Sequence, residues 1–238
     1  MRVPGAGDLR TTWTPARGEP RGWVWLQHGF ARSGRHLGGL ADLLAGHGFA
    51  VVRPDVASFT PWRSMHDRAY LTACALTIAA AVQEGTVADR GVAVGGPWLG
   101  VGHSAGAAIV VQAAAVLGAH GLPPAGLILL DPVDTVGGLL VGALPDLGAV
   151  PIVAFACPPS RCNRHGSTVD HLRGRAEIVD LAGLSHADPE RIPARLDVAA
   201  VPPAGRAVVW ACGPPGSQAA VVGLGERTLA AAERLCPV

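Results

Sequence analysis

The sequence predicts an α/β fold in which helices cover both faces of a mostly parallel central sheet. Short apolar runs alternate with longer helix-like segments along the chain. The hydrophobic fraction of 49% and the charged fraction of 16% suit a chain with a large buried interior. No linker, repeat or low-complexity tract divides the sequence, so we expect residues 1–238 to form a single domain.

The expected strands are short and apolar, and the expected helices are longer and rich in Ala and Leu. Strands are predicted at Trp23–Gln27, Phe49–Arg53, Trp98–Gly102, Gly126–Leu130, Pro151–Ala156, Glu177–Asp180 and Ala207–Trp210. Helices are predicted at Leu37–His47, Ala69–Gln83, Ala105–Ala119 and Ala219–Leu235. We expect the strand that begins at Trp98 to be the central one.

The charge composition excludes several classes of function. The formal net charge is +1, and all 19 basic residues are arginine. Without lysine the chain has no Schiff-base lysine, no phosphate-loop lysine and no Ser-Lys pair, so a histidine is the expected base of any nucleophilic catalysis. The charges form no block of one sign, and we expect neither nucleic acid nor an anionic membrane as a partner.

The cysteine pattern argues against a metal site. The sequence has five cysteines, an odd number, without a C-x-x-C pair or zinc-type spacing. Cys157 is close enough in sequence to bridge Cys162, and Cys212 to bridge Cys236, but reduced buried thiols fit the pattern equally well.

The sequence shows no long apolar segment and no targeting signal. The first ten residues do not run from a charged stretch into an apolar one, and no span of 18 apolar residues occurs. We therefore expect no integral membrane segment and a soluble, cytoplasmic protein, or a secreted one if a leader has been removed. The sequence leaves the oligomeric state open.

A G-x-S-x-G motif is the strongest functional signal. Gly102-His103-Ser104-Ala105-Gly106 lies between a predicted strand and a predicted helix, which is the context that a nucleophile elbow requires. The glycines allow a sharp turn that lifts Ser104 toward solvent, where the start of the helix directs N–H groups at the reacting oxygen. The alternative is a serine that only caps an ordinary turn.

Two backbone amides are expected to stabilise the oxyanion that forms when Ser104 attacks a carbonyl. One is the N–H of Ala105, directly after the nucleophile. The other is the N–H of Phe30 in the His28-Gly29-Phe30 loop, which follows an earlier strand. The alternative for this loop is a simple glycine turn.

These residues resemble α/β-hydrolases of the chlorophyllase and cutinase-like polyester-hydrolase groups. The resemblance rests on the HGF loop, the GHSAG elbow and the segment Leu129–Asp134, and it covers roughly residues 23–188. It implies the α/β-hydrolase fold, an ester substrate and Asp131 as the acid. Only about twenty residues separate the strands between which many such enzymes insert a lid, so we expect no large lid domain. The elbow lacks the GHSRGG sequence of chlorophyllases, so chlorophyll cleavage does not follow.

Elimination also favours Asp131 as the acid. Many hydrolases of this fold place the acid after the next strand, but Cys157–Asn163 contains no carboxylate. Asp134 and Asp170 remain as weaker alternatives, and Asp131 before a proline can also serve as a turn cap.

The base of this fold follows the acid in chain order, on the loop after the last major strand. His186 lies there among small residues, just past Asp180. His165 and His171 lie before that strand, where surface roles are expected.

The resulting hypothesis is a serine hydrolase that cleaves carboxylic esters through Ser104, His186 and Asp131, without metal or cofactor. Phe30, Trp62 and His103 are the candidates for its substrate pocket, although Trp62 fits ordinary packing as well. The same residues would suit a thioesterase, an amidase or an acyltransferase. A hydrolase-fold binding protein without activity is the alternative outside enzymes.

Overall fold

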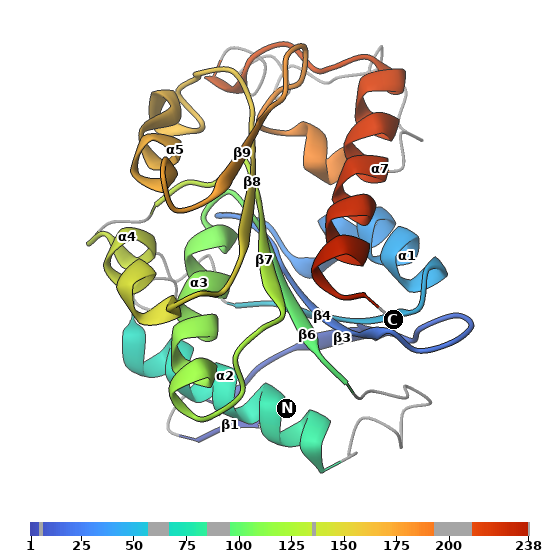
Figure 1. The fold of residues 1–238 in the computed structure, drawn as a ribbon, viewed down its shortest axis with the longest axis vertical. Helices are drawn as coiled ribbons and strands as arrows, with labels where there is room; N and C mark the ends of the chain where they lie inside the picture. The colour runs from blue at the N-terminus through green and yellow to red at the C-terminus, as the bar shows by residue number, and fades with distance from the viewer. Residues whose placement is uncertain (5–6, 57–66, 85–95, 135–136, 193–210, 238) are drawn as a thin grey trace.

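A computed structural model describes residues 1–4, 7–56, 67–84, 96–134, 137–192 and 211–237. A seven-stranded sheet forms its centre, with helices on both faces (Figure 1). The strands of this sheet are β3 (Thr11–Thr14), β4 (Gly22–Gln27), β5 (Phe49–Pro54), β6 (Trp98–His103), β7 (Gly126–Leu130), β8 (Ile152–Ala156) and β9 (Glu177–Asp180). This is the predicted mostly parallel α/β architecture, and it lacks a large lid within the described residues.

The strand order is β3-β5-β4-β6-β7-β8-β9, so β6 is the central strand, as predicted. Only β3 runs antiparallel, beside β5, and the other neighbours are parallel. Strand β3 was not predicted, because Thr11–Thr14 is short and half-exposed. The small ribbon of β1 (Arg2–Val3) and β2 (Gly7–Asp8) was not predicted either. The strand expected at Ala207–Trp210 lies outside the described residues.

Helices divide between the two faces of the sheet (Figure 1). The helices of the described chain are α1 (Gly38–Gly46), α2 (Arg68–Gln83), α3 (Gly106–Ala119), α4 (Leu139–Ala143), α5 (Ser167–Leu172) and α7 (Gln218–Leu235). Helices α1 and α7 cover one face, and α2, α3, α4 and α5 lie on the other. The short helices α4 and α5 were not predicted, because five or six residues are too few to show a helical period.

The two faces bury separate apolar clusters. Alternate residues of the parallel strands point to opposite faces, so Val24 and Val101 pack toward α1 and α7, whereas Trp25 and Leu129 pack toward α2 and α3. Trp23 and Trp98 stack on neighbouring strands with ring centroids 5.3 Å apart. Since β4, β6 and β7 are buried along their whole length, the carboxyl ends of these strands are held rigidly at one edge.

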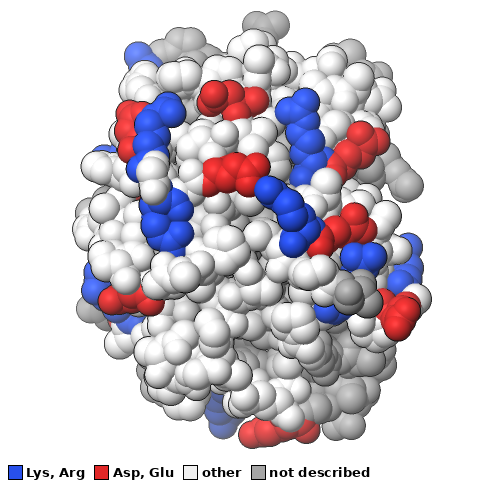
Figure 2. Space-filling view, in the orientation of Figure 1, with Lys and Arg blue, Asp and Glu red and all other residues white. Residues whose placement is uncertain are grey.

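Charged side chains of opposite sign are interspersed on the surface. On the face shown in Figure 2, arginines lie next to acidic residues rather than in a block. Arg234 and Glu177, for example, form a partly exposed ion pair 2.7 Å apart. None of the described helices combines the length and apolarity needed to cross a bilayer.

Substitution Ile128→Ala should destabilise the fold strongly, because Ile128 is fully buried on β7 and its removal leaves a cavity. We expect a loss of about 2–5 kcal/mol in the free energy of unfolding, measured by urea denaturation. Val222→Ala on α7 is the control: Val222 is 42% exposed, and its substitution should change stability by less than about 0.5 kcal/mol. Equal effects of the two substitutions would contradict this account of the core.

Candidate active site

Ser104 occupies a sharp turn between β6 and α3. Its φ is 56°, a left-handed conformation that is strained for a residue with a side chain. The two glycines of the motif make the turn possible. A Cβ on Gly102 would lie 2.6 Å from the carbonyl oxygen of Gly106, and one on Gly106 would lie 2.5 Å from the carbonyl oxygens of Gln27 and His28. The backbone therefore fixes Ser104 at the carboxyl edge of the central strand, at the start of a buried helix.

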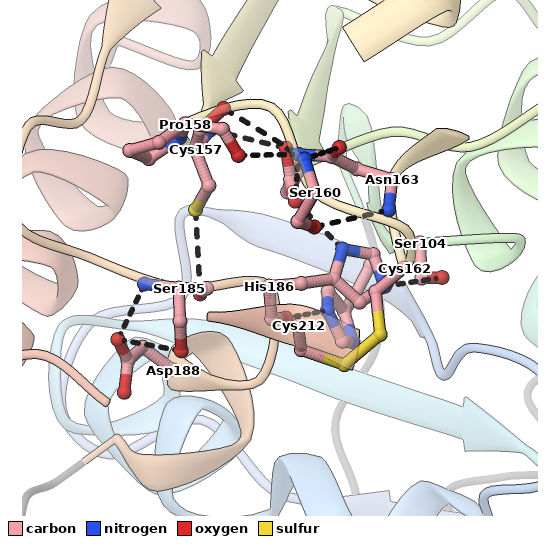
Figure 3. Close-up of polar contacts among 12 residues, drawn as sticks. Ser104, Cys157, Pro158, Ser160, Cys162, Asn163, Ser185, His186, Asp188 and Cys212 are labelled. Carbon is pink, nitrogen blue, oxygen red and sulfur yellow. Dashed lines mark hydrogen bonds and ion pairs between the residues drawn. A yellow bond between two sulfur atoms is a disulfide. The ribbon is translucent and has the colours of Figure 1, made fainter. Parts of the chain in front are cut away.

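Ser104, His186 and Asp131 form one hydrogen-bonded chain. Ser104 Oγ lies 2.9 Å from His186 Nε2, and His186 Nδ1 lies 2.6 Å from Asp131 Oδ2. Because an ionised carboxylate only accepts, the proton of a neutral His186 is on Nδ1. Nε2 is then the acceptor for the Ser104 hydroxyl proton. The three side chains come from segments far apart in sequence that the parallel sheet brings together, and Figure 3 shows Ser104 and His186 side by side.

Asp131 is buried and surrounded by donors. It follows β7 with a φ of 43° and is 1% exposed. The backbone N–H of Cys157 donates to Asp131 Oδ1 over 3.0 Å, and the side-chain amide of Asn163 lies 3.2 and 3.1 Å from the two carboxylate oxygens. These donors stabilise the charged form of a carboxylate that has little contact with water.

The other carboxylates and histidines considered from the sequence lie elsewhere. Asp134 accepts the backbone N–H groups of Leu140 and Val141 and so holds the start of α4. Asp170 is exposed and pairs with an arginine of the same turn. His165 and His171 are exposed on the surface.

A buried carboxylate also supports the loop that carries His186. Asp188 is fully buried, and its Oδ2 accepts the backbone N–H and the hydroxyl of Ser185 over 2.7 and 3.1 Å. It also accepts the N–H of Gly216 over 2.8 Å and pairs with Arg191. The role of Asp188 was not predicted from the sequence, because its partner Gly216 lies in a distant segment.

His103 supports the same loop from the other side. Its Nε2 lies 2.7 Å from the backbone carbonyl of His186, so Nε2 carries the proton and donates. Burial, reinforced by the neighbouring His186, lowers the pKa of His103 to about 3, which keeps the ring neutral. Its Nδ1 is buried with no hydrogen-bond partner among the described residues, 3.6 Å from Glu190. His103 lines the pocket beside Ser104, and its ring hydrogen-bonds to the protein backbone.

The two backbone amides expected to bind an oxyanion lie next to Ser104. A Cβ on Gly29 would lie 2.9 Å from the Cβ of Ser104, so the His28-Gly29-Phe30 loop passes directly against the serine. Ala105 begins the turn into α3. Within the described residues, the N–H groups of Phe30 and Ala105 donate to no other residue.

A pocket of about 200 Å³ opens beside Ser104. Its walls include Phe30, which is 55% exposed, two cysteines joined in a disulfide, and an ion pair between Arg32 and Glu190 at 2.9 Å. Trp62, the remaining candidate for this pocket, lies outside the described residues. No group of three metal-ligating side chains gathers in the described part of the chain.

The disulfide joins Cys162 to Cys212, so neither pairing considered from the sequence, Cys157 with Cys162 or Cys212 with Cys236, is present. Cys162 and Cys212 are 50 residues apart, and the fold rather than the sequence spacing brings them together. Cys74, Cys157 and Cys236 are buried free thiols. Burial raises the pKa of Cys157 far above its usual range, with the Asp131 charge adding to the effect, so this thiol stays protonated.

Comparison with known proteins identifies the fold. No family model matches the chain, and no curated protein matches it. Among solved structures, the chain resembles an esterase domain from Rhodothermus marinus, with 15% identity, a TM-score of 0.56 and coverage of 95% of this chain and 99% of that one. It also resembles a variant of monoglyceride lipase from Saccharomyces cerevisiae, with 12% identity, a TM-score of 0.61 and coverage of 97% and 92%.

A putative thioesterase from a Silicibacter species is a third similar structure, with 16% identity, a TM-score of 0.54 and coverage of 76% of this chain and 74% of that one. At these identities the likeness establishes the fold and not the activity. The chain therefore has the α/β-hydrolase fold, as predicted.

Stability should fall on acidification in a way that depends on His103. The pKa of His103 is about 3 in the folded chain and has the ordinary value of 6.5 in the unfolded chain. Between these two pH values the unfolded chain therefore binds a proton at His103 and the folded chain does not. This difference costs up to roughly 1.4 kcal/mol per pH unit as the pH falls from about 6.5 toward about 3.

In the variant His103→Gln, position 103 has no imidazole to bind a proton in the unfolded chain. The free energy of unfolding of this variant should therefore fall less steeply between about pH 7 and about pH 5. Urea denaturation at several pH values measures both slopes. His171→Gln, at an exposed histidine, is the control and should keep the wild-type slope. Parallel slopes for His103→Gln and wild type would contradict the buried, neutral state of His103.

Proposed function

We propose that the protein is a serine hydrolase that cleaves carboxylic esters through an acyl-enzyme intermediate. The observation that carries this proposal is the unbroken hydrogen-bonded chain from Ser104 Oγ through His186 to the buried carboxylate of Asp131. A serine hydroxyl alone is a weak nucleophile, and a neighbouring imidazole of fixed tautomer makes it reactive. The strained turn that presents Ser104 supports the same proposal, as do the amides of Phe30 and Ala105, which make no hydrogen bond to the described residues.

The first half of the reaction acylates Ser104. Ser104 Oγ attacks the ester carbonyl carbon while His186 Nε2 takes the hydroxyl proton. The negative charge that develops on the carbonyl oxygen is held by the N–H groups of Phe30 and Ala105. Asp131 keeps the proton of His186 on Nδ1 and stabilises the imidazolium. His186 then gives its proton to the departing alcohol oxygen as the carbon–oxygen bond breaks.

The second half repeats these steps with water. His186 removes a proton from water, whose oxygen attacks the acyl carbon, and it returns that proton to Ser104 Oγ as the acid product leaves. Every atom is supplied by ester, water and these side chains, so the scheme calls for no cofactor. The same steps suit a thioester or an amide, and an alcohol in place of water would make the protein an acyltransferase.

The similar structures are consistent with this class of reaction, since two of them are described as an esterase domain and a monoglyceride lipase. A small-molecule or polymeric ester is the proposed substrate. The narrower placement near the chlorophyllase and cutinase-like polyester-hydrolase groups still rests on the sequence motifs alone. The exposed Phe30 beside Ser104 suits a ligand with an apolar acyl group, as in an aliphatic or aromatic ester.

Substitution of either Ser104 or His186 by alanine should abolish turnover of p-nitrophenyl esters. We expect kcat to fall on the order of 10⁴-fold or more, because either change removes the nucleophile or its base. Wild type should also be labelled covalently by a fluorophosphonate, and Ser104→Ala should not. Circular dichroism confirms folding of each variant. A folded wild type without turnover or labelling would favour a binding protein, and activity in Ser104→Ala would contradict the assignment.

The identity of the acid is tested by paired amide substitutions. Asp131→Asn should lower kcat on the order of 10³- to 10⁴-fold, because a side-chain amide no longer holds the His186 proton on Nδ1. Asp134→Asn is the matched control, three residues away, where the carboxylate contacts the start of α4. It should lower stability and leave kcat within about threefold of wild type. The reverse order of effects would reassign the acid.

A further inference from the structure

The loop that follows β8 donates hydrogen bonds to Asp131, the proposed acid. In many hydrolases of this fold that loop carries the acid itself, but here Asp131 comes one strand earlier and Cys157–Asn163 contains no carboxylate. The loop instead contributes donors. Its first residue, Cys157, gives a backbone N–H to Asp131, and its last, Asn163, gives a side-chain amide. Asn163 is the only asparagine in the chain.

The orientation of the Asn163 amide is fixed by its other contacts. Asn163 is 1% exposed, and its Oδ1 accepts the backbone N–H of Ser160 over 2.8 Å. The amide nitrogen Nδ2 therefore points the other way, toward both oxygens of Asp131 and the carbonyl of Pro158 at 3.0 Å. A carboxylate needs donors and Pro158 offers an acceptor, so only this orientation satisfies every group.

The disulfide ties this loop to the segment that supports the base (Figure 3). Cys162 precedes Asn163 and is joined to Cys212 by the disulfide and, through its N–H, to the carbonyl of Ala211 over 3.2 Å. Four residues after Cys212, Gly216 donates to Asp188, the carboxylate that holds the His186 loop.

Gly216 can approach Asp188 closely because it has no side chain. A Cβ there would lie 2.8 Å from the carbonyl oxygen of Gly183 and 2.6 Å from the side chain of Leu184. The carbonyl of Gly216 also accepts from Arg191 over 2.9 Å. Residues 211–216 thus connect the loop beside Asp131 to the loop beside His186.

We propose that Asn163 is a positioning residue of the active site, which holds the Asp131 carboxylate in the plane that meets His186 Nδ1, and that the Cys162–Cys212 disulfide fixes Asn163 there. This inference rests on the proposed hydrolase function. Asn163 donates to both oxygens and Cys157 to one, while His186 lies at the other, so the carboxylate cannot rotate without breaking these bonds. Losing Asn163 would leave Asp131 short of a donor and free to turn away from His186.

The variant Asn163→Asp tests the donor with little change in shape. The new carboxylate can still accept from Ser160 N–H, so the loop keeps its turn. Two carboxyl groups that share a site raise one pKa strongly, so at low pH a shared proton replaces the lost N–H donor. At higher pH both groups are ionised and repel. We expect the kcat of Asn163→Asp, divided by that of wild type at the same pH, to fall at least about tenfold between about pH 6 and pH 9.

The variant Asn163→Ala removes the donor at every pH. Its kcat should fall roughly tenfold to a hundredfold, the usual effect of losing a hydrogen bond to a buried charge, while KM for a p-nitrophenyl ester changes less than about threefold. Ser160→Ala is the matched control within the loop. It removes a hydroxyl that contacts Asn163 N at 3.4 Å without touching Asp131, and it should keep kcat and the pH profile of wild type.

The disulfide is tested by Cys162→Ser with Cys212→Ser, and by adding a reductant to wild type. Both should lower kcat by a similar factor, roughly tenfold, while the double variant should not respond to reductant. The remaining cysteines are buried free thiols, so reductant has no second disulfide to open. If reduced wild type keeps its full kcat, the claim that the disulfide fixes Asn163 is wrong.

The outcomes separate this inference from the proposed function. If wild type is not labelled by a fluorophosphonate, the hydrolase function itself fails. If wild type is labelled and active, an Asn163→Asp variant with the wild-type pH profile overturns the positioning role, whether its kcat is unchanged or uniformly reduced. Should Asn163→Asp not fold by circular dichroism, Asn163→Ala decides, and a change confined to KM or to stability overturns the role.

Discussion

The site depends on one buried negative charge and the way the fold satisfies it. Asp131 is almost fully removed from water, so its carboxylate is tolerated only because Cys157, Asn163 and His186 direct donors at it. These donors come from three separate parts of the chain. Each of them also limits where the carboxylate points, so the contacts that stabilise the charge also orient the imidazole toward Ser104.

The parallel sheet makes this convergence possible. Strands β4, β6, β7, β8 and β9 all end at the same edge, and their following loops carry Gly29, Ser104, Asp131, Asn163 and His186. Buried strands and the two apolar clusters hold the edge rigid, whereas the loops beyond it are fixed by polar contacts such as those of Asp188. Stability therefore comes mainly from the sheet and its helices, and the accuracy of the site comes from hydrogen bonds in the loops.

The residues around Asp131 show how the fold accommodates a buried carboxylate at the end of β7. The loop after β8 approaches Asp131 closely enough to offer a backbone N–H, but an acidic residue there would bring two carboxylates together and raise the cost of ionising both. An asparagine at this position supplies a neutral donor of almost the same shape. The disulfide next to it joins the loop beside Asp131 to the segment whose Gly216 contacts Asp188, in the loop that carries His186.

The sequence by itself determined the strong strands, the central place of the one that begins at Trp98, the turn at Ser104 and the choice of Asp131 and His186 as its candidate partners. These features have local signals: apolar runs, two glycines at fixed spacing and a chain order imposed by the fold. Only the tertiary structure decided the pairing of Cys162 with Cys212, the contact of Asn163 with Asp131 and the support of the His186 loop by Asp188 and Gly216. Each of these contacts joins segments tens of residues apart or depends on the direction of a single side chain. Neither periodicity nor spacing encodes such proximity, because it arises only when the strands have assembled and their loops meet at one edge.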